Sequence, residues 1–283
     1  MIRLLRNTLL TALLLALVGG VGLYAAVPMI ERNMAFHPMR YDPRTPWRLP
    51  ADTTDVHFAA ADGVRLHGWF LAGRAPRNGA TVLYFHGNGG TLVGSTGDAE
   101  FLRAQGYDVF VIDYRGYGKS EGATLGESTL ALDGEAALRW LTAVRFIDPA
   151  SVVLFGHSLG TTVAADLAVT QPCRAVVLVA PLASARRQAQ SLDRFAWLPG
   201  FYFDRMANRF DTEGKIGRAR CPVLVAHGDR DSTISVDQGR AVYDAARPPK
   251  TLVIVPGGGH GLQLAARHDY AQQVVDFLRG PTK

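Results

Sequence analysis

The chain has 283 residues, of which 48% are hydrophobic and 19% are charged. This composition excludes a disordered or low-complexity protein, and α/β folds often exceed 200 residues as a single unit. The net charge is +5, but the arginines are scattered and form no basic stripe interleaved with aromatic residues, so we expect no nucleic acid among the partners.

The N-terminal segment, residues 1–31, contains an uncharged stretch from residue 7 to residue 30 that follows Arg3 and Arg6. About 20 apolar residues are enough for a helix to span a bilayer, so the segment predicts a single-pass transmembrane helix. It is longer than the apolar region of a typical cleavable signal peptide, which favours an uncleaved signal anchor, and cleavage near residues 23–26 is the alternative.

Arginines on both sides of this segment leave its orientation open. Long domains are translocated largely regardless of local charge. We therefore expect an N-terminus on the inside and a periplasmic, extracytoplasmic catalytic domain.

A linker rich in Pro and Arg, residues 32–50, precedes a domain expected over residues 51–283. Short Val-rich runs bounded by Gly, Pro or Asp predict buried parallel strands over residues 64–71, 81–85, 109–113, 152–155, 175–180, 223–226 and 252–255. Apolar residues at helical spacing predict helices over residues 127–144, 159–169 and 274–278. The alternation of the two predicts an α/β fold with a mostly parallel, doubly wound sheet.

Residues 183–220 interrupt this alternation of strands and helices. They separate two strand runs and are rich in aromatic residues. A connection this long inside a compact domain is usually functional, so we interpret it as a small helical cap insertion. Trp197, Phe201 and Tyr202 are expected to line one wall of a substrate pocket. The cap is small, which predicts acyl chains of short to medium length, and the alternative is that these aromatics only pack the cap onto the sheet.

The strongest motif is Gly156-His157-Ser158-Leu159-Gly160, between a predicted strand and a predicted helix. This strand–turn–helix context is typical of a nucleophile elbow, in which a sharp turn exposes the serine hydroxyl at the helix N-terminus. The sequence therefore predicts Ser158 as the nucleophile, in preference to an ordinary turn serine.

A serine hydroxyl needs a base, and in this fold the chain order is Ser, then Asp or Glu, then His. Asp231 and His260 follow two later strand runs in that order, which predicts a Ser158, Asp231, His260 triad. Asp229 is the competing choice of acid, and Asp231 as a helix cap is the structural alternative. We interpret His86 and His227, each before a Gly at a strand end, as residues that shape loops rather than catalyse.

Acyl transfer also needs hydrogen-bond donors that stabilise the negative charge on the oxyanion. The backbone N–H of Leu159, directly after the nucleophile, predicts one donor, and the Gly-rich loop at residues 86–90 predicts a second, the backbone N–H of Asn88.

Several phrases together resemble a known family: HGNGG (86–90), DYRGYGKSEG (113–122), GHSLG (156–160), HGDRD (227–231), GGGH (257–260), MAFHP (34–38), WLPG (197–200) and RFDTEGKI (209–216). They are similar to the membrane-anchored, acyl-thioesterase-related branch of the α/β-hydrolase domain proteins, over most of the chain from residue 30 onward. The resemblance implies hydrolysis of esters, thioesters or amides by a serine nucleophile without a cofactor, and it places the acid at Asp231. Ile234-Ser235, where the family has a hydrophobic residue and Pro, is a minor departure.

The sequence thus predicts a serine hydrolase of the carboxylesterase or thioesterase type that works through an acyl-enzyme. Its substrate is expected to be a small-molecule or lipid acyl compound, with a lipidated protein as a further option. A peptidase or amidase of the same fold and a non-catalytic, membrane-tethered binding module remain as alternatives.

The two cysteines, Cys173 and Cys221, each lie just before a strand run. In this fold the two strands are neighbours, so a disulfide and a pair of free thiols are both open. With no Cys/His cluster in the sequence, we expect no metal site.

Overall fold

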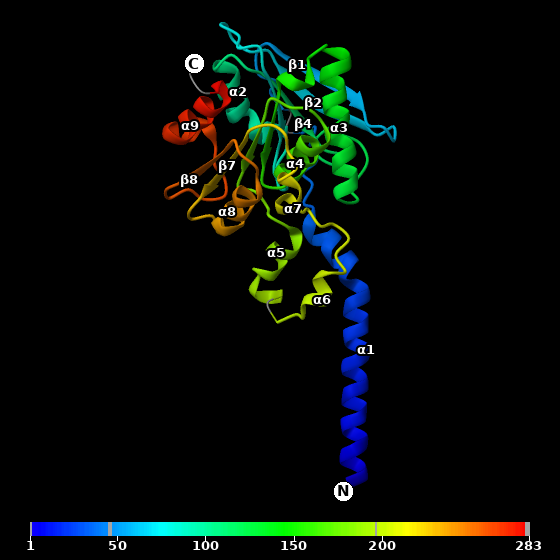
Figure 1. Ribbon diagram of the computed structural model, residues 1–283. Coiled ribbons are helices and arrows are strands. Elements are labelled where there is room, and N and C mark those ends of the chain that lie inside the picture. Colours follow the sequence, from blue (N-terminus) through cyan, green and yellow to red (C-terminus); the bar gives the residue numbers. More distant parts are fainter. Residues whose placement is uncertain (1, 45–46, 196, 281–283) are drawn as a thin grey trace.

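The computed structural model of the chain describes residues 2–44, 47–195 and 197–280 (Figure 1). Residues 45–46 of the expected linker, residue 196 of the expected cap and residues 281–283 at the end of the expected domain lie outside the described residues.

A single sheet forms the centre of the domain, with strand order β1-β2-β4-β3-β5-β6-β7-β8. The strands are β1 (Thr53–Ala59), β2 (Arg65–Leu71), β3 (Thr81–Phe85), β4 (Asp108–Asp113), β5 (Val152–His157), β6 (Ala175–Val179), β7 (Val223–Gly228) and β8 (Lys250–Val255). Strand β2 pairs antiparallel with β1 and β4, and the other pairs are parallel. The predicted α/β-hydrolase fold with a mostly parallel sheet is confirmed.

Helices cover both faces of this sheet. The α-helices are α1 (Ile2–Ala35), α2 (Thr96–Ala104), α3 (Glu127–Val144), α4 (Gly160–Thr170), α5 (Ala185–Gln190), α6 (Gly200–Phe203), α7 (Thr212–Ile216), α8 (Val236–Ala245) and α9 (His268–Arg279). Short 3-10 turns are η1 (Leu92–Ser95), η2 (Pro149–Ser151), η3 (Asp193–Phe195) and η4 (Leu264–Ala266).

Two apolar clusters form the core, one on each face of the sheet. Buried residues of α3, α4, α7 and α8 pack in the first, and buried residues of α2 and α9 pack in the second. This is the doubly wound arrangement that the alternating strand and helix patterns predict.

The parallel strands bring one set of loops together. The loops after β3, β5, β7 and β8 all leave the sheet at the carboxyl ends of parallel strands, the edge at which open α/β sheets bind ligands. The candidate catalytic residues lie on these four loops.

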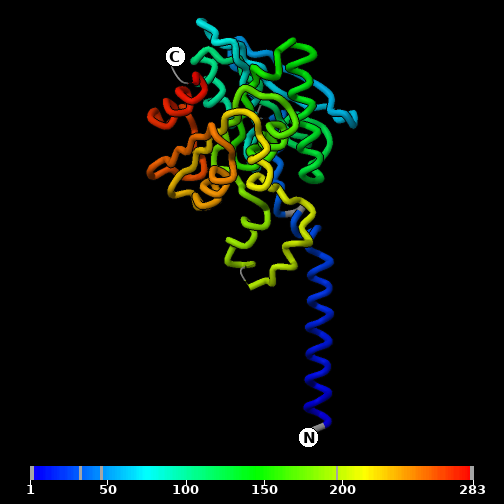
Figure 2. The backbone as a smooth tube through the Cα atoms, in the orientation of Figure 1, coloured from blue at the N-terminus to red at the C-terminus, as the bar shows by residue number. Residues whose placement is uncertain are grey.

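Helix α1 projects from the domain, and its inner end lies beside the cap helix α6 (Figures 1 and 2). Its residues 3–19 are exposed, whereas contact with the domain begins at Gly20. The stretch Arg3–Glu31 is long and apolar enough to cross a membrane. The helix ends at Ala35, so it continues past the expected segment 1–31 into the expected linker.

Cys173 and Cys221 form a disulfide between the segments that lead into β6 and β7, with a Cα–Cα distance of 6.1 Å. Of the two states that the sequence leaves open, the structure has the bond. It joins the segments at the N-terminal ends of the neighbouring strands β6 and β7, whereas the candidate catalytic loops follow the C-terminal ends of the strands.

Candidate active site

Ser158 lies on the sharp turn between β5 and α4, as the elbow motif predicts. Its φ is 52°, in the left-handed region that a non-glycine residue rarely adopts. A Cβ atom at Gly156 would collide with the carbonyl oxygen of Gly160, and one at Gly160 with the carbonyl oxygen of Phe85. The two glycines of the motif are therefore required by the close approach of strand, turn and helix.

His260 bridges Ser158 and Asp231. Its Nε2 lies 3.0 Å from Ser158 Oγ, and its Nδ1 lies 2.8 Å from Asp231 Oδ2. With the proton on Nδ1, the ring donates to the carboxylate and accepts a hydrogen bond from the serine hydroxyl. The structure thus brings together three residues that are 29 to 102 positions apart, in the arrangement of a catalytic triad.

The side chain of Asp231 is fully buried, and its carboxylate accepts several hydrogen bonds. The backbone N–H groups of Thr233 and Ile234 donate to Oδ1 at 2.8 and 2.9 Å, and His227 Nε2 lies 3.2 Å from Oδ2. Burial would raise the pKa of this carboxyl, but the hydrogen bonds from His227 and His260 outweigh burial and hold the pKa well below its ordinary value. The group is therefore a permanent negative charge beside His260.

Asp229, the competing acid, is exposed. Its Oδ1 accepts the backbone N–H of Gly257 at 2.7 Å, which closes the loop after β8 onto the loop after β7.

His157, the residue before Ser158, lies against the other side of the base. Burial lowers the pKa of its imidazole to about 4, so the ring is neutral at pH 7. Its Nε2 lies 2.9 Å from the carbonyl oxygen of His260, which helps to hold the main chain of the histidine loop.

The loop after β3 passes directly beside Ser158. A Cβ atom at Gly87 would lie 3.4 Å from the Cβ of Ser158. Within the described part of the chain, the N–H groups of Asn88 and Leu159 donate to no other protein group. Both N–H groups are therefore free to donate, and their role as the oxyanion donors stays a prediction.

The side chain of Asn88 anchors this loop. Its Oδ1 accepts from the Tyr117 hydroxyl at 2.8 Å and from the backbone N–H of His37 at 3.0 Å. His86 is buried, with Nδ1 2.7 Å from the carbonyl oxygen of Gly87, which suits the loop-shaping role expected for it. The contact with His37, which directly follows α1, has no signal in the sequence.

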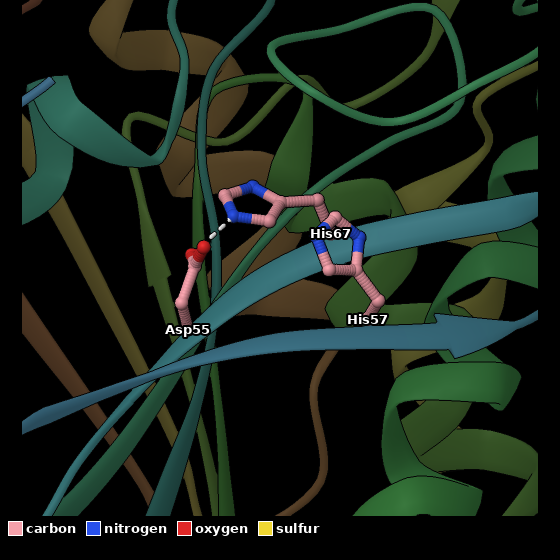
Figure 3. Close-up of side chains that lie close together, drawn as sticks. All are labelled: Asp55, His57 and His67. Atoms are coloured by element: carbon pink, nitrogen blue, oxygen red, sulfur yellow. Dashed lines mark hydrogen bonds and ion pairs between the residues drawn. The ribbon is translucent and has the colours of Figure 1, made fainter. Parts of the chain in front are cut away.

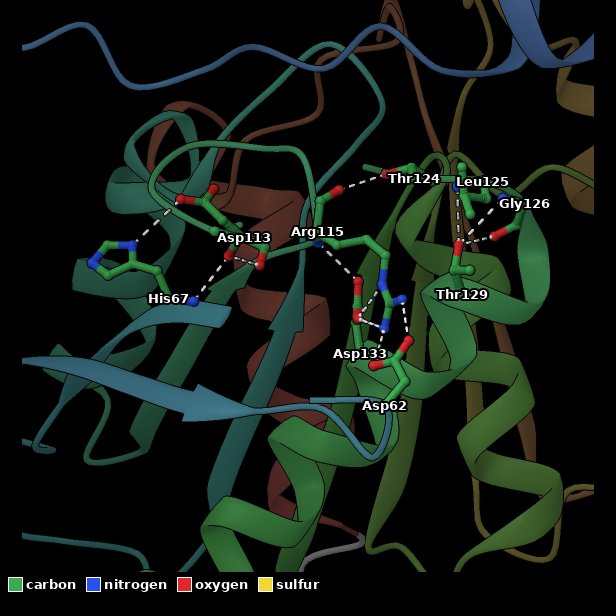
Figure 4. Close-up of polar contacts among 10 residues, drawn as sticks. Asp62, His67, Asp113, Arg115, Thr124, Leu125, Gly126, Thr129 and Asp133 are labelled. Atoms are coloured by element: carbon green, nitrogen blue, oxygen red, sulfur yellow. Dashed lines mark hydrogen bonds and ion pairs between the residues drawn. The ribbon is translucent and has the colours of Figure 1, made fainter. Parts of the chain in front are cut away.

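The phrase DYRGYGKSEG at residues 113–122 has a structural role, and Figure 4 shows the polar contacts of its residues Asp113 and Arg115. Arg115 is buried and donates to Asp133 in α3 at 2.8 Å and to Asp62 in the β1–β2 turn at 2.6 Å. Burial raises the pKa of Asp133 to about 6. These ion pairs fix the loop after β4 behind the oxyanion loop.

Ser158 and His260 open into a cavity of about 870 Å³. The cap supplies apolar wall residues, among them Leu192, Phe195, Leu198 and Tyr202. Trp197 and Phe201, which the sequence analysis placed in this wall, point elsewhere: they are 71% and 55% exposed and do not line the cavity. The wall expected from these two residues comes from their neighbours.

The second wall comes from α1. Leu23, Val27, Ile30 and Met34 line the same cavity as Ser158. This role has no signal in the sequence, because the whole segment is apolar and no side of the helix is distinguished by composition.

Glu31 and Tyr24 attach α1 to the cap. The two carboxylate oxygens of Glu31, a buried residue, accept the backbone N–H groups of Ala207 and Asn208, each at 2.7 Å. The ring of Tyr24 lies 6.1 Å from that of Phe201 and 6.0 Å from that of Tyr202. The cap is therefore built around the inner end of α1.

Asp55, His57 and His67 form the group in Figure 3, with potential ligand atoms within 4.8 Å of one another. His67 Nε2 lies 2.6 Å from Asp55 Oδ1, which also accepts from Trp69 Nε1 at 2.9 Å, and Lys119 Nζ lies 3.7 Å from Oδ2. These contacts give Asp55 a structural role, because they link β1 to β2 at the edge of the sheet. The expectation of no metal site stays a prediction.

The chain is similar to proteins of one sequence family. The family model described as "Serine aminopeptidase, S33" matches residues 76–212. A protein of Mycobacterium tuberculosis, "Uncharacterized protein Rv2307c", is 35% identical over 212 residues, which are 75% of this chain and 73% of that protein. "Uncharacterized protein YfhR" of Escherichia coli K12 is 31% identical over 263 residues, 89% of this chain and 88% of that protein.

Two further similar proteins are named for an activity. The "Lysophosphatidylserine lipase ABHD12" of Danio rerio is 32% identical over 230 residues, 71% of this chain and 58% of that protein. The solved structure of the Pyrococcus furiosus esterase Pf2001 superposes with a TM-score of 0.69 over 86% of this chain and 98% of its own, at 22% identity. At that identity the likeness concerns the fold.

Proposed function

Since this chain belongs to the α/β-hydrolase family, we propose that it is a serine hydrolase that cleaves acyl esters or thioesters through Ser158, His260 and Asp231. The observation that carries the proposal is the pair of contacts at His260, 3.0 Å to Ser158 Oγ and 2.8 Å to Asp231 Oδ2, at a serine held in a left-handed backbone conformation.

The first half of the reaction forms an acyl-enzyme. Ser158 Oγ attacks the carbonyl carbon while His260 Nε2 takes its proton, and the carbonyl oxygen becomes an oxyanion. The N–H groups of Leu159 and Asn88 stabilise that charge. His260 then gives the proton to the leaving alcohol or thiol as the bond to the carbonyl carbon breaks.

The second half releases the acid. Water enters, His260 takes one of its protons, and the hydroxide oxygen attacks the acyl carbon. Ser158 leaves with the proton returned from His260, and the carboxylic acid departs. Throughout, the charge of Asp231 stabilises the imidazolium form of His260.

The cavity supports an acyl substrate over a peptide. Its wall beside Ser158 is largely apolar, which suits a hydrocarbon chain. The lipase activity in the name of the Danio rerio relative points the same way, toward a lipid or small-molecule ester. The name of the family model, an aminopeptidase, keeps amide hydrolysis as the second candidate.

We further propose that α1 anchors the enzyme in a membrane with the catalytic domain outside the cytoplasm. The helix has the required length and apolar composition. The disulfide between Cys173 and Cys221 supports an oxidising compartment such as the periplasm.

Labelling with a fluorophosphonate probe tests the enzyme proposal. The purified full chain is expected to react covalently and to hydrolyse p-nitrophenyl esters, and Ser158→Ala is expected to lose both properties. Labelling that persists in Ser158→Ala would move the nucleophile elsewhere, and a folded wild type that neither reacts nor hydrolyses would favour a non-catalytic binding module.

A further inference from the structure

One side of α1 carries an apolar stripe that faces the catalytic cavity. Leu23, Val27, Ile30 and Met34 are spaced by four, three and four residues, which places them on one face of a helix. At 1.5 Å per residue the stripe is about 16 Å long. It lines the cavity that contains Ser158, so an acyl chain bound at the serine has an extended apolar surface beside it.

The outer part of the same helix has no partner in the described protein. Residues 3–19 are exposed, and they include large apolar side chains such as Leu13 and Val18, which are 57% and 60% exposed. Twenty helical residues rise about 30 Å, the thickness of the hydrocarbon core of a bilayer. Counted from Leu4, that thickness ends near Tyr24.

The cap residues that touch Tyr24 therefore lie at the boundary between lipid and water. Phe201, which touches Tyr24, is 55% exposed there although it is large and apolar. Aromatic side chains are enriched at this depth of a membrane. This location explains why Phe201 faces outward, away from the cavity.

We propose that the inner half of α1 is one wall of the acyl-chain site, and that the site takes the acyl chain of a membrane lipid, which enters along α1 from the bilayer. The inference rests on the proposed hydrolase function and names its substrate class. The lipid-facing part of α1 and the stripe in the cavity belong to one continuous helix, so a chain that leaves the bilayer beside α1 has apolar side chains of the same helix next to it as it enters the cavity that contains Ser158. Glu31 lines this cavity too, and both of its carboxylate oxygens are bonded to backbone N–H groups of the cap.

The contacts of Glu31 and Tyr202 fix this wall. Glu31 accepts two backbone N–H groups of the cap, and the Tyr202 hydroxyl donates to the carbonyl oxygen of Gly20 at 3.1 Å. The wall therefore keeps its position relative to the cap while the helix continues into the membrane.

Substitutions on the two sides of α1 test the proposal in the full chain, reconstituted in phosphatidylcholine vesicles. Val27→Trp and Ile30→Trp fill the cavity, and Val21→Trp is the matched control because Val21 is 60% exposed on the same helix and does not line the cavity. The substrates are p-nitrophenyl palmitate dissolved in the vesicles and p-nitrophenyl acetate in the water, with rates counted per site labelled by fluorophosphonate.

Each methylene that loses its contact costs about 0.8 kcal/mol, so the loss of two or three contacts lowers kcat/KM about 10- to 50-fold. We expect the ratio of palmitate to acetate hydrolysis to fall by this factor in Val27→Trp and Ile30→Trp and to stay within about twofold of wild type in Val21→Trp.

An unchanged ratio in both cavity variants, or an equal fall in Val21→Trp, would overturn the proposed wall. Wild type that hydrolyses p-nitrophenyl palmitate well in detergent micelles but not the same ester in vesicles would overturn the bilayer as the source of the chain. Neither result bears on the triad, whereas a wild type without labelling and without acetate hydrolysis refutes the proposed function itself.

Discussion

Two aspartates of the loop after β7, only two positions apart, have opposite surroundings. Asp231 is buried between His260, His227 and two backbone N–H groups, whereas Asp229 is exposed and bonds the N–H of Gly257. We expect Asp231→Asn to lower kcat by about 10⁴, the loss seen when the acid of a serine-protease triad is made neutral. Asp229→Asn is the matched control and should lose less than about tenfold.

The measurement is the initial rate of p-nitrophenyl ester hydrolysis by both variants at equal folded concentration. A larger loss of rate in Asp229→Asn than in Asp231→Asn would show that Asp229, and not Asp231, is the acid.

Ser158 combines a catalytic hydroxyl with an unfavourable backbone conformation. A left-handed φ costs a non-glycine residue about 1–2 kcal/mol, and glycine avoids most of this cost. Ser158→Gly is therefore expected to abolish hydrolysis while raising the melting temperature by about 2–4 °C, and Ser158→Ala should abolish it without that gain. Differential scanning fluorimetry of the three proteins measures the difference, and a Ser158→Gly protein that melts below Ser158→Ala would contradict the strain.

His157 makes stability depend on pH. Its pKa falls from 6.5 in the unfolded chain to about 4 in the fold, so between these values the unfolded chain binds more protons. The stability that the neutral ring contributes is present above pH 6.5 and is lost as the pH falls toward 4. We expect His157→Gln, which cannot titrate, to have a smaller fall in melting temperature between pH 7 and pH 4.5 than wild type. Parallel curves for the two proteins would rule out this contribution.

At the scale of elements, α1 has two parts that meet at Gly20: an exposed outer part and an inner part that contacts the cap. Deletion of residues 2–19 keeps the stripe in the cavity, whereas deletion of residues 2–30 removes Leu23, Val27 and Ile30 from its wall. We expect the first protein to retain the palmitate-to-acetate ratio of the full chain in detergent, and the second to lose about tenfold or more of it. An unaltered ratio in the shorter protein would show that the cap alone selects the chain.

The loss expected for the second protein goes beyond the sequence analysis, in which residues 1–31 are assigned only the role of a transmembrane helix. The cap was also expected to enclose only short to medium chains. With α1 as a second wall, we now expect longer chains to be accepted.

The elements that sequence predicted well are those with one dominant pattern. Buried strands such as β3 and the long helix α3 have the predicted bounds, because an apolar run or a helical period is visible without any partner. Strand β1 was missed because it lies at the sheet edge with mostly exposed, polar residues. The proximity of Ser158, Asp231 and His260 was predictable because a short motif and the order of the residues in the chain indicate it. The contact of α1 with the cap has no such signal, because it joins segments about 180 positions apart.

At the scale of the whole molecule, the disulfide closes a loop of 48 residues that contains the cap. A loop of this size contributes about 2–4 kcal/mol by restricting the unfolded chain. Cys173→Ser with Cys221→Ser is therefore expected to melt several degrees lower than wild type while its ester hydrolysis at 25 °C is kept. Equal melting temperatures, or wild-type thiols that react with maleimide without a reductant, would contradict the bond.

The cap is attached to α1 at Glu31 and Tyr202, so the proposed membrane anchoring would confine the proposed reaction to the two dimensions of the bilayer surface. A catalytic serine held at a fixed height above a bilayer encounters only lipids that diffuse laterally to the helix. Its rate then follows the mole fraction of substrate in the membrane rather than the amount per volume of solution. Dilution of the substrate with inert lipid should slow such an enzyme, and addition of buffer should not.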